Sequence, residues 1–114
     1  MGVLSKAPTT MDNCIEACIR CARACDECHT ACLEEADVKE RAMCIKTLTD
    51  CAAICYESAA MMSRNSTFSK QHCQLCAEIC EACAVECEKF KDDHCQECAK
   101  ICRECAEACR NMAS

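Results

Sequence analysis

Cysteine recurs along this chain with the period of an α-helix. Within each group, successive cysteines lie three, four or seven residues apart, and the opposite faces carry Glu, Lys, Arg and Asp. Steps of three and four keep side chains on one face of a helix. The pattern therefore predicts helices with a stripe of sulfur on one face and a charged outer face. The groups are Cys14, Cys18, Cys21, Cys25, Cys28 and Cys32; Cys44, Cys51 and Cys55; Cys73, Cys76, Cys80, Cys83 and Cys87; and Cys95, Cys98, Cys102, Cys105 and Cys109.

Four groups of cysteines predict four helices and an all-α fold. Because the connections are short, neighbouring helices are expected to run antiparallel in an up-down-up-down four-helix bundle. The four stripes can be buried only against one another, which predicts a cysteine-lined core. The expected helices span roughly residues 12–35, 38–63, 69–89 and 93–112.

Polar residues at the group boundaries are candidate helix caps. Residues 1–9 contain Pro8 and lack the helical period, so we expect a flexible N-terminal arm there and a single bundle domain over residues 10–114. The candidate caps are Thr10 or Asp12 for the first helix, the pair Asp37 and Glu40 for the second, Ser66, Thr67 or Ser69 for the third, and the pair Asp93 and Gln96 for the fourth.

Composition excludes several classes of protein. The 114 residues include 19 cysteines but only one Gly, one Pro and no Trp, which argues against collagen-like, linker-like and aromatic-cored β folds. The net charge of −6 leaves no basic surface for nucleic acid or anionic lipid. No apolar run is long enough for a signal peptide or a membrane span. We therefore expect a cytoplasmic protein with reduced thiols.

Two structural explanations of the cysteines are weak. Leu, Ile and Ala would fill core positions with less risk of oxidation than a uniform stripe of thiols. A disulfide scaffold is usually secreted and rich in loops, whereas this chain has an odd number of cysteines and almost no Gly or Pro. Cysteines on one helix at these spacings are also too far apart to pair, with Cβ atoms about 5–6 Å apart. Metal binding is the explanation of the cysteine pattern that remains.

Charge favours Cu(I) among the metals that bind thiolate. Four or five Zn²⁺ ions would leave the 19 thiolates with a charge of about −9 to −11 in a poorly hydrated column, which is costly. Iron–sulfur clusters also take thiolates, but a single CxxC spacing is a weak signal for them. About one monovalent soft ion per sulfur brings the column close to neutrality, and thiolate selects Cu(I). Many cuprous ions are therefore expected.

The spacing also supplies repeated two-sulfur units. Leu48 and Ser58 interrupt the stripe of the second helix, which is expected to serve partly as an apolar wall. Eight CxxxC pairs can be drawn without reuse of a residue, and each places two sulfurs one turn apart. The pairs are Cys14/Cys18, Cys21/Cys25, Cys28/Cys32, Cys51/Cys55, Cys76/Cys80, Cys83/Cys87, Cys98/Cys102 and Cys105/Cys109.

The CxxxC stripes and the closing segments resemble the copper storage proteins of bacteria, specifically their cytosolic branch without a leader. The segments are Cys73-Gln-Leu-Cys-Ala-Glu-Ile-Cys-Glu-Ala-Cys and His94-Cys-Gln-Glu-Cys-Ala-Lys-Ile-Cys, and the resemblance covers roughly residues 12–113. It implies a homotetramer of four-helix bundles, each filled with Cu(I), and it makes each of the 19 cysteines a ligand. No ligand carries over to Leu48 or Ser58.

Methionine and histidine side chains gather at the two ends of the expected bundle. Thioether and neutral imidazole both suit copper, so these side chains are candidate ligands where ions are admitted. Methionines that close an apolar bundle end, and histidines in surface or capping roles, are equally consistent with the pattern. One end collects Met11, Met62 and Met112 with Met61 and His72 nearby; the other collects His29, Met43 and His94.

The sequence thus predicts a non-enzymatic cytosolic store of copper that takes up many Cu(I) ions, about one per cysteine, from a copper chaperone. No acid–base pair beside a nucleophile is apparent, and a thiol stripe alone is not an enzyme. Two other functions stay open on the residues alone. One is an electron-transfer protein with iron–sulfur clusters, and the other is a thiol redox buffer without metal.

Overall fold

The computed structural model describes residues 2–4 and 11–114. Residues 12–113 are helical apart from short connections. A 3₁₀ turn, η1, precedes the second helix. The elements are α1 (Asp12–Leu33), η1 (Val38–Arg41), α2 (Ala42–Ser63), α3 (Ser69–Glu88) and α4 (Asp93–Ala113). Most of the expected arm at residues 1–9 lies outside the described residues, and so does Thr10; the arm stays a prediction.

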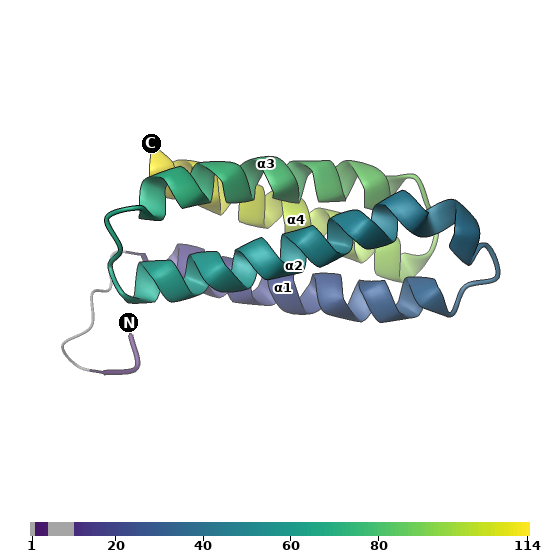
Figure 1. Ribbon diagram of the computed structural model, residues 1–114, viewed down its shortest axis with the longest axis horizontal. Helices are drawn as coiled ribbons and strands as arrows, with labels where there is room; N and C mark the ends of the chain where they lie inside the picture. The colour runs from purple at the N-terminus through teal and green to yellow at the C-terminus, as the bar shows by residue number, and fades with distance from the viewer. Residues whose placement is uncertain (1, 5–10) are drawn as a thin grey trace.

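The four helices form an up-down-up-down bundle, as predicted (Figure 1). Helix α1 packs against α2 and α4, and α3 packs against the same two helices. Helices of 20 to 22 residues are about 30–33 Å long, so each stripe of cysteines extends through nearly the whole bundle. None of the described helices combines the length and hydropathy needed to cross a bilayer.

The bundle has two different ends. At one end lie the α1–α2 and α3–α4 connections, on the right in Figure 1; we call it the His94 end because His94 lies there in the first turn of α4. At the other end lie the start of α1, the α2–α3 connection and the C-terminus; we call it the Met62 end. The predicted pairing of chain segments at each end is confirmed.

Most of the predicted side-chain caps are wrong; the exception is Ser66, whose Oγ accepts a hydrogen bond from the Phe68 N–H at 3.1 Å just before α3. None of the described helices has a side-chain hydrogen bond from its N-cap residue. Asp12, Ser69 and Asp93 are the first helical residues instead of the residues before them. The carboxylates of Asp12 and Asp93 therefore lie in the first turn, where the helix dipole favours negative charge.

The two predicted capping boxes fail for identifiable reasons. The Asp37 carboxylate accepts a hydrogen bond from Arg41 Nε at 2.6 Å, and the tight η1 turn replaces the first turn expected for the second helix. Gln96 donates its side-chain amide to the Phe90 carbonyl at 2.7 Å, which ties α4 to the preceding connection instead of capping it. The side chains predicted to cap the two helices are therefore used instead for an ion pair and for a hydrogen bond to the preceding connection.

The end of α2 is a Schellman motif. Asn65 has a φ of 54°, a left-handed conformation that Asn tolerates better than most residues. Its N–H donates to the Met62 carbonyl at 3.0 Å, and the Ser66 N–H donates to the Met61 carbonyl at 3.0 Å. These two bonds satisfy carbonyls that the helix end leaves free. The chain then reverses into α3, which places Met62 at the bundle end.

The core consists mainly of cysteine and alanine. Every cysteine is buried, and alanines alternate with them on the inward faces. Small side chains let the helix axes approach closely, so the bundle needs no large aromatic residue to fill its centre. Leu48 is fully buried in α2, as expected for an apolar wall where the stripe of sulfur is interrupted. The buried alanines are Ala22, Ala52, Ala59, Ala77, Ala84, Ala99 and Ala106.

Candidate metal centre

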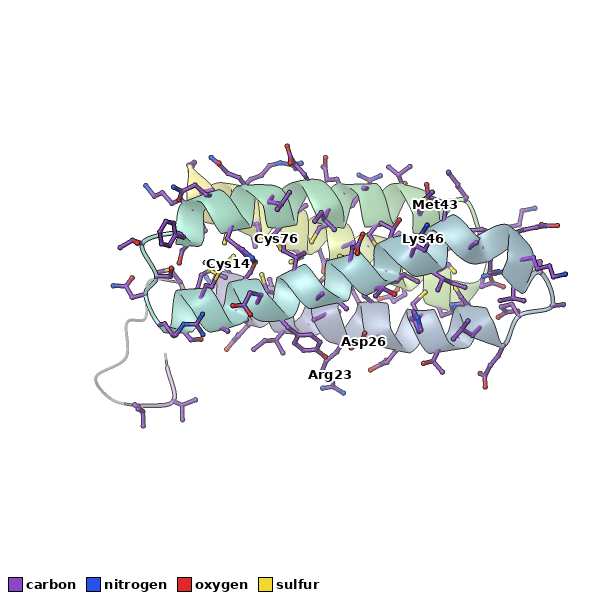
Figure 2. The ribbon with its side chains drawn as sticks, in the orientation of Figure 1. Cys14, Arg23, Asp26, Met43, Lys46 and Cys76 are labelled. Carbon is purple, nitrogen blue, oxygen red and sulfur yellow. The ribbon has the colours of Figure 1, made fainter. Side chains whose placement is uncertain are left out.

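The 19 cysteine side chains form one column along the bundle axis. Figure 2 shows their sulfurs between the helices, with Cys14 and Cys76 directed inward while Arg23 projects away from the bundle. All 19 thiols are free, and each of the residues is 4% exposed or less. The disulfide scaffold considered from the sequence is therefore absent from this structure.

Sulfur contacts sulfur between neighbouring helices and across the bundle diagonals. The Sγ atoms of Cys55 and Cys80, on neighbouring helices, are 3.5 Å apart. On the diagonals, Cys25 of α1 lies 4.0 Å from Cys83 of α3. Such contacts of 4.0 Å or less recur from one end of the bundle to the other, from Cys14 with Cys109 to Cys32 with Cys95.

The sulfurs form donor groups of a size that suits a metal ion. Several groups of three or four donors have all their atoms within 4.8 Å of one another. An ion with sulfur bonds of about 2.3 Å in tetrahedral geometry places its sulfurs roughly 3.8 Å apart, close to the contacts seen here. The all-cysteine groups include Cys18, Cys76, Cys105 and Cys109; Cys21, Cys55, Cys80 and Cys105; Cys21, Cys25, Cys51 and Cys102; and Cys14, Cys73 and Cys109.

Two CxxxC pairs have their sulfurs in direct contact. The Sγ–Sγ distance is 3.9 Å for Cys28/Cys32 and 3.9 Å for Cys76/Cys80. Many other close contacts connect different helices, such as the 3.6 Å contact between Cys18 and Cys109. Ions held here would therefore join helices as well as turns of one helix.

Protons are unevenly distributed along the column. Burial, followed by the hydrogen bond to Cys32, raises the pKa of the Cys95 thiol to about 12. Hydrogen bonds from Cys102 and Cys25 lower the pKa of the Cys83 thiol to about 6. Donation of hydrogen bonds to Cys105 and other neighbours raises the pKa of Cys55 well above its ordinary value. The column without metal therefore holds both thiols and thiolates, and metal displaces the protons of the former.

His94 lies at the end of the column, as predicted. Its Nδ1 is 3.4 Å from Cys28 Sγ and 3.5 Å from Cys95 Sγ, and its Nε2 is 3.0 Å from a Glu35 carboxylate oxygen. A carboxylate on the far nitrogen orients an imidazole toward a metal. His94, Cys28, Cys32 and Cys95 together form a four-donor group.

The other candidates at this end lie away from the column. Met43 is 59% exposed, so it is not one of the buried donors. Figure 2 places it near the same end as the α1–α2 connection. His29 is half-buried beside Cys28 on α1. Of the side chains predicted for the His94 end, the structure brings only His94 into contact with sulfur in the donor group described here.

At the Met62 end, Met62 is hydrogen-bonded to a sulfur of the column. Met62 is fully buried, and its Sδ accepts a hydrogen bond from Cys73 Sγ at 3.7 Å. Met11 and Met112 are half-buried and pack against the core. His72 is half-buried, and its Nδ1 is 2.7 Å from the hydroxyl of Ser58, which is fully buried at a stripe position of α2.

Arg41 is a part of the site that the sequence analysis missed. It is only 4% exposed, and its Nη1 donates to Cys32 Sγ at 3.6 Å and to Cys95 Sγ at 3.5 Å. Burial opposes its charge, but hydrogen bonds to Asp37 and Asp92 outweigh that effect and keep the pKa of the guanidinium above its ordinary value. The signal was present, since Arg41 precedes Cys44 by three residues and so continues the stripe.

These features define a class of protein. An all-α bundle whose axis is filled by 19 buried, unbridged thiols, with an imidazole at one end, is a protein that holds several soft metal ions. The family model described as copper storage protein matches residues 7–114. The chain belongs to the copper storage protein family. No curated protein sequence matches the chain.

Solved structures of this family are close to the bundle described here. The Cu(I)-bound copper storage protein BsCsp3 is 50% identical, with a TM-score of 0.87 over 90% of this chain and 97% of that chain. The apo form of Csp3 from Bacillus subtilis, also 50% identical, has a TM-score of 0.86 over 90% of this chain and 98% of that chain. Ccsp from Streptomyces lividans, loaded with 10 copper equivalents, is 40% identical, with a TM-score of 0.87 over 90% of this chain and 83% of that chain.

Proposed function

We propose that this chain is a cytosolic store of copper that binds Cu(I) along its sulfur column, about one ion per cysteine. The observation that carries the proposal is the column itself, in which all 19 thiols are buried and free and most of them lie within 4.0 Å of another sulfur. Isolated structural sites would need four ligands each and would be separated by ordinary packing. A continuous column suits many ions that share sulfurs.

The charge of the ion decides between metals that fit the distances. Thiolates of a buried column need about one positive charge each, and a monovalent ion supplies this without a large negative surplus. The relatives agree with the choice of metal, because BsCsp3 is Cu(I)-bound and Ccsp from Streptomyces lividans is a cytosolic copper storage protein solved with five coppers. Cu(I) is therefore the cargo assigned to this chain.

Further parts of the proposal concern individual ligands and assembly. All 19 cysteines are ligands, His94 is the end ligand at one end and Met62 is the end ligand at the other. The contacts of His94 Nδ1 with Cys28 and of Met62 Sδ with Cys73 support these two roles. The chain stores copper without catalysis, receives it from a copper chaperone and assembles as a homotetramer. Residues 1–9 form a flexible arm outside the storage domain.

An anaerobic titration tests the function. The reduced apo protein is titrated with Cu(I) in the presence of a chromophoric Cu(I) chelator, and we expect more than about ten ions per chain to be taken from it. The double variant Cys76→Ser/Cys80→Ser removes one contacting pair and should lower the capacity by about two ions. Thr49→Ser, on the exposed face of α2, is the matched control and should leave the capacity unchanged.

Two results would contradict the proposal. A brown protein with acid-labile sulfide after anaerobic purification would identify an iron–sulfur protein. A protein that takes little Cu(I) from the chelator and accumulates disulfides between helices would be a thiol redox buffer.

A further inference from the structure

A groove runs along the outside of the bundle where α1 and α4 meet. Its volume is about 340 Å³, and its walls are facing rows of the two helices. Alanine at two positions of the α1 row leaves space that larger side chains would fill. The α1 row is Ala24, Glu27, Cys28 and Ala31, and the α4 row is His94, Glu97, Cys98 and Ile101.

Two cysteines of the column reach this groove. Cys28 and Cys98 are each 2% exposed, whereas Cys32 and Cys95, which lie nearer the end of the bundle, are 0% exposed. Cys44, at the start of α2, is 1% exposed. Of the column sulfurs near the His94 end, those of Cys28 and Cys98 therefore lie nearest to solvent, and both line the groove at the side of the bundle.

Arg41 covers the axial end. Its Nη1 contacts the sulfurs of Cys32 and Cys95, while Nε and Nη2 pair with Asp37 at 2.6 Å and Asp92 at 2.5 Å. The Phe90 ring centroid lies 4.4 Å from the guanidinium carbon. An ion that approached along the axis would have to displace a buried cation whose nitrogens all have partners.

The groove offers copper ligands in a connected order. His94 Nδ1 lies 3.4 Å from Cys28 Sγ, and Cys28 Sγ lies 3.9 Å from the sulfurs of Cys32 and of Cys95. On the other wall, the Cys98 thiol interacts with Cys102 and Cys25 deeper in the column. The carboxylates of Glu27 and Glu97 at the rim attract a cation to this place.

We propose that Cu(I) enters the sulfur column through the α1/α4 groove, with Cys28, Cys98 and His94 as its first ligands, while Arg41 closes the axial end of the bundle. The inference rests on the proposed storage of Cu(I) and adds the route by which the ions arrive. The entry route can be tested separately from the copper capacity, because a larger side chain can fill the groove without removal of any cysteine.

Substitution of an alanine in the groove tests the route. Ala31→Phe fills the groove, and Ala53→Phe places the same side chain on the exposed face of α2 as a matched control. The rate and the final amount of Cu(I) transfer from a chromophoric chelator complex are measured anaerobically by stopped flow. We expect Ala31→Phe to slow the transfer by about tenfold, with the same final amount, and Ala53→Phe to match the unchanged protein. Ala24→Phe, at the other small position of the row, replaces Ala31→Phe if that variant does not fold.

Removal of Arg41 tests the closed end. In the Ala31→Phe background, Arg41→Ala opens the axis and should restore most of the lost rate, with circular dichroism used to verify the helices. A rate that stays slow in this double variant would show that Arg41 is not the axial barrier.

The outcomes distinguish the route from the function. Unchanged protein that takes up little Cu(I) would refute storage. Unchanged protein that loads fully, with Ala31→Phe and Ala53→Phe equally fast, would refute the groove alone. That result would direct attention to the Met62 end, where Cys14 is 4% exposed.

Discussion

Single side chains at the two ends of the bundle determine how the column begins and ends. Arg41 and Met62 both continue the cysteine stripe of α2, one before Cys44 and one after Cys55 and Ser58. Each is buried, and each contacts sulfur of another helix. The stripe therefore extends past its last cysteines, with a cation at one end and a thioether at the other.

The Arg41 contacts predict a loss of stability when the guanidinium is removed. Arg41→Met breaks two ion pairs and two hydrogen bonds to sulfur, and it should lower the free energy of unfolding of the apo protein by about 1–3 kcal/mol. The cost stays below that of a fully buried pair because water reaches Asp37 and Asp92. Urea unfolding followed by circular dichroism measures the change.

Arg103→Met is the matched control, since Arg103 makes its ion pair with Glu88 on the exposed surface. Its effect on unfolding should be much smaller, because exposed pairs contribute little. Equal effects of the two variants would show that the buried contacts of Arg41 add nothing.

Met62 allows its packing to be separated from its chemistry. Met62→Ala leaves a cavity and should destabilise the apo protein by about 2–5 kcal/mol, whereas Met62→Leu keeps the volume and should cost less than about 1.5 kcal/mol. Met62→Leu still lacks the thioether. If Met62 is the end ligand, the most weakly held Cu(I) should bind about tenfold more weakly, as measured by chelator competition.

The exposed Met43 provides the control for this experiment. Met43→Leu should change neither the unfolding nor the copper affinity. Equal copper affinity in Met62→Leu and the unchanged protein would limit Met62 to the closure of the bundle end.

The helices themselves were predictable from the cysteine period, and their ends were not. The period located all four helices because burial of one face determines where each helix can run. It failed at the caps because Asp37 and Gln96 bind other nearby groups instead, Arg41 four residues later and the Phe90 carbonyl six residues earlier. The cap pattern alone does not show which of these competing local partners is bound. The donor groups could not be predicted either. Contacts such as Cys55 with Cys105 depend on how far one helix is shifted along the bundle axis relative to another, which the sequence does not give.

The packed core predicts helices that form before metal binds. Buried cysteine and alanine already supply apolar contacts between all neighbouring helices. The far-ultraviolet circular dichroism of the reduced apo protein should therefore show a highly helical chain, and added Cu(I) should raise the melting temperature with little change in helicity. A coil that becomes helical only with copper, as in zinc fingers, would contradict this.

The whole column couples copper loading to pH. The Cys95 thiol, with its pKa raised to about 12, is protonated at pH 7 and must lose its proton to bind Cu(I) as thiolate. Cys83, with its pKa lowered to about 6, is mostly ionised at that pH and contributes much less than one proton. Loading at pH 7 should therefore release protons, but fewer than one per thiol that becomes a ligand.

An indicator dye in weak buffer measures these protons during an anaerobic titration. The affinity should fall as the pH falls, by about tenfold per pH unit for each proton displaced. The same copper addition to buffer without protein is the control. Loading without proton release would mean that the column is fully ionised before copper arrives.

The sulfur-to-sulfur contacts across the diagonals of the bundle have an evolutionary consequence. In most proteins, interior residues can drift among hydrophobic types while the surface site keeps its chemistry. Here the two sets of residues coincide, since Cys25 and Cys83 fill the centre and also supply donors. Replacement of one such cysteine by alanine costs little packing but removes a ligand. Selection on copper capacity, more than selection on folding, would therefore preserve the interior. Sequence divergence would be confined to the outer faces of the helices.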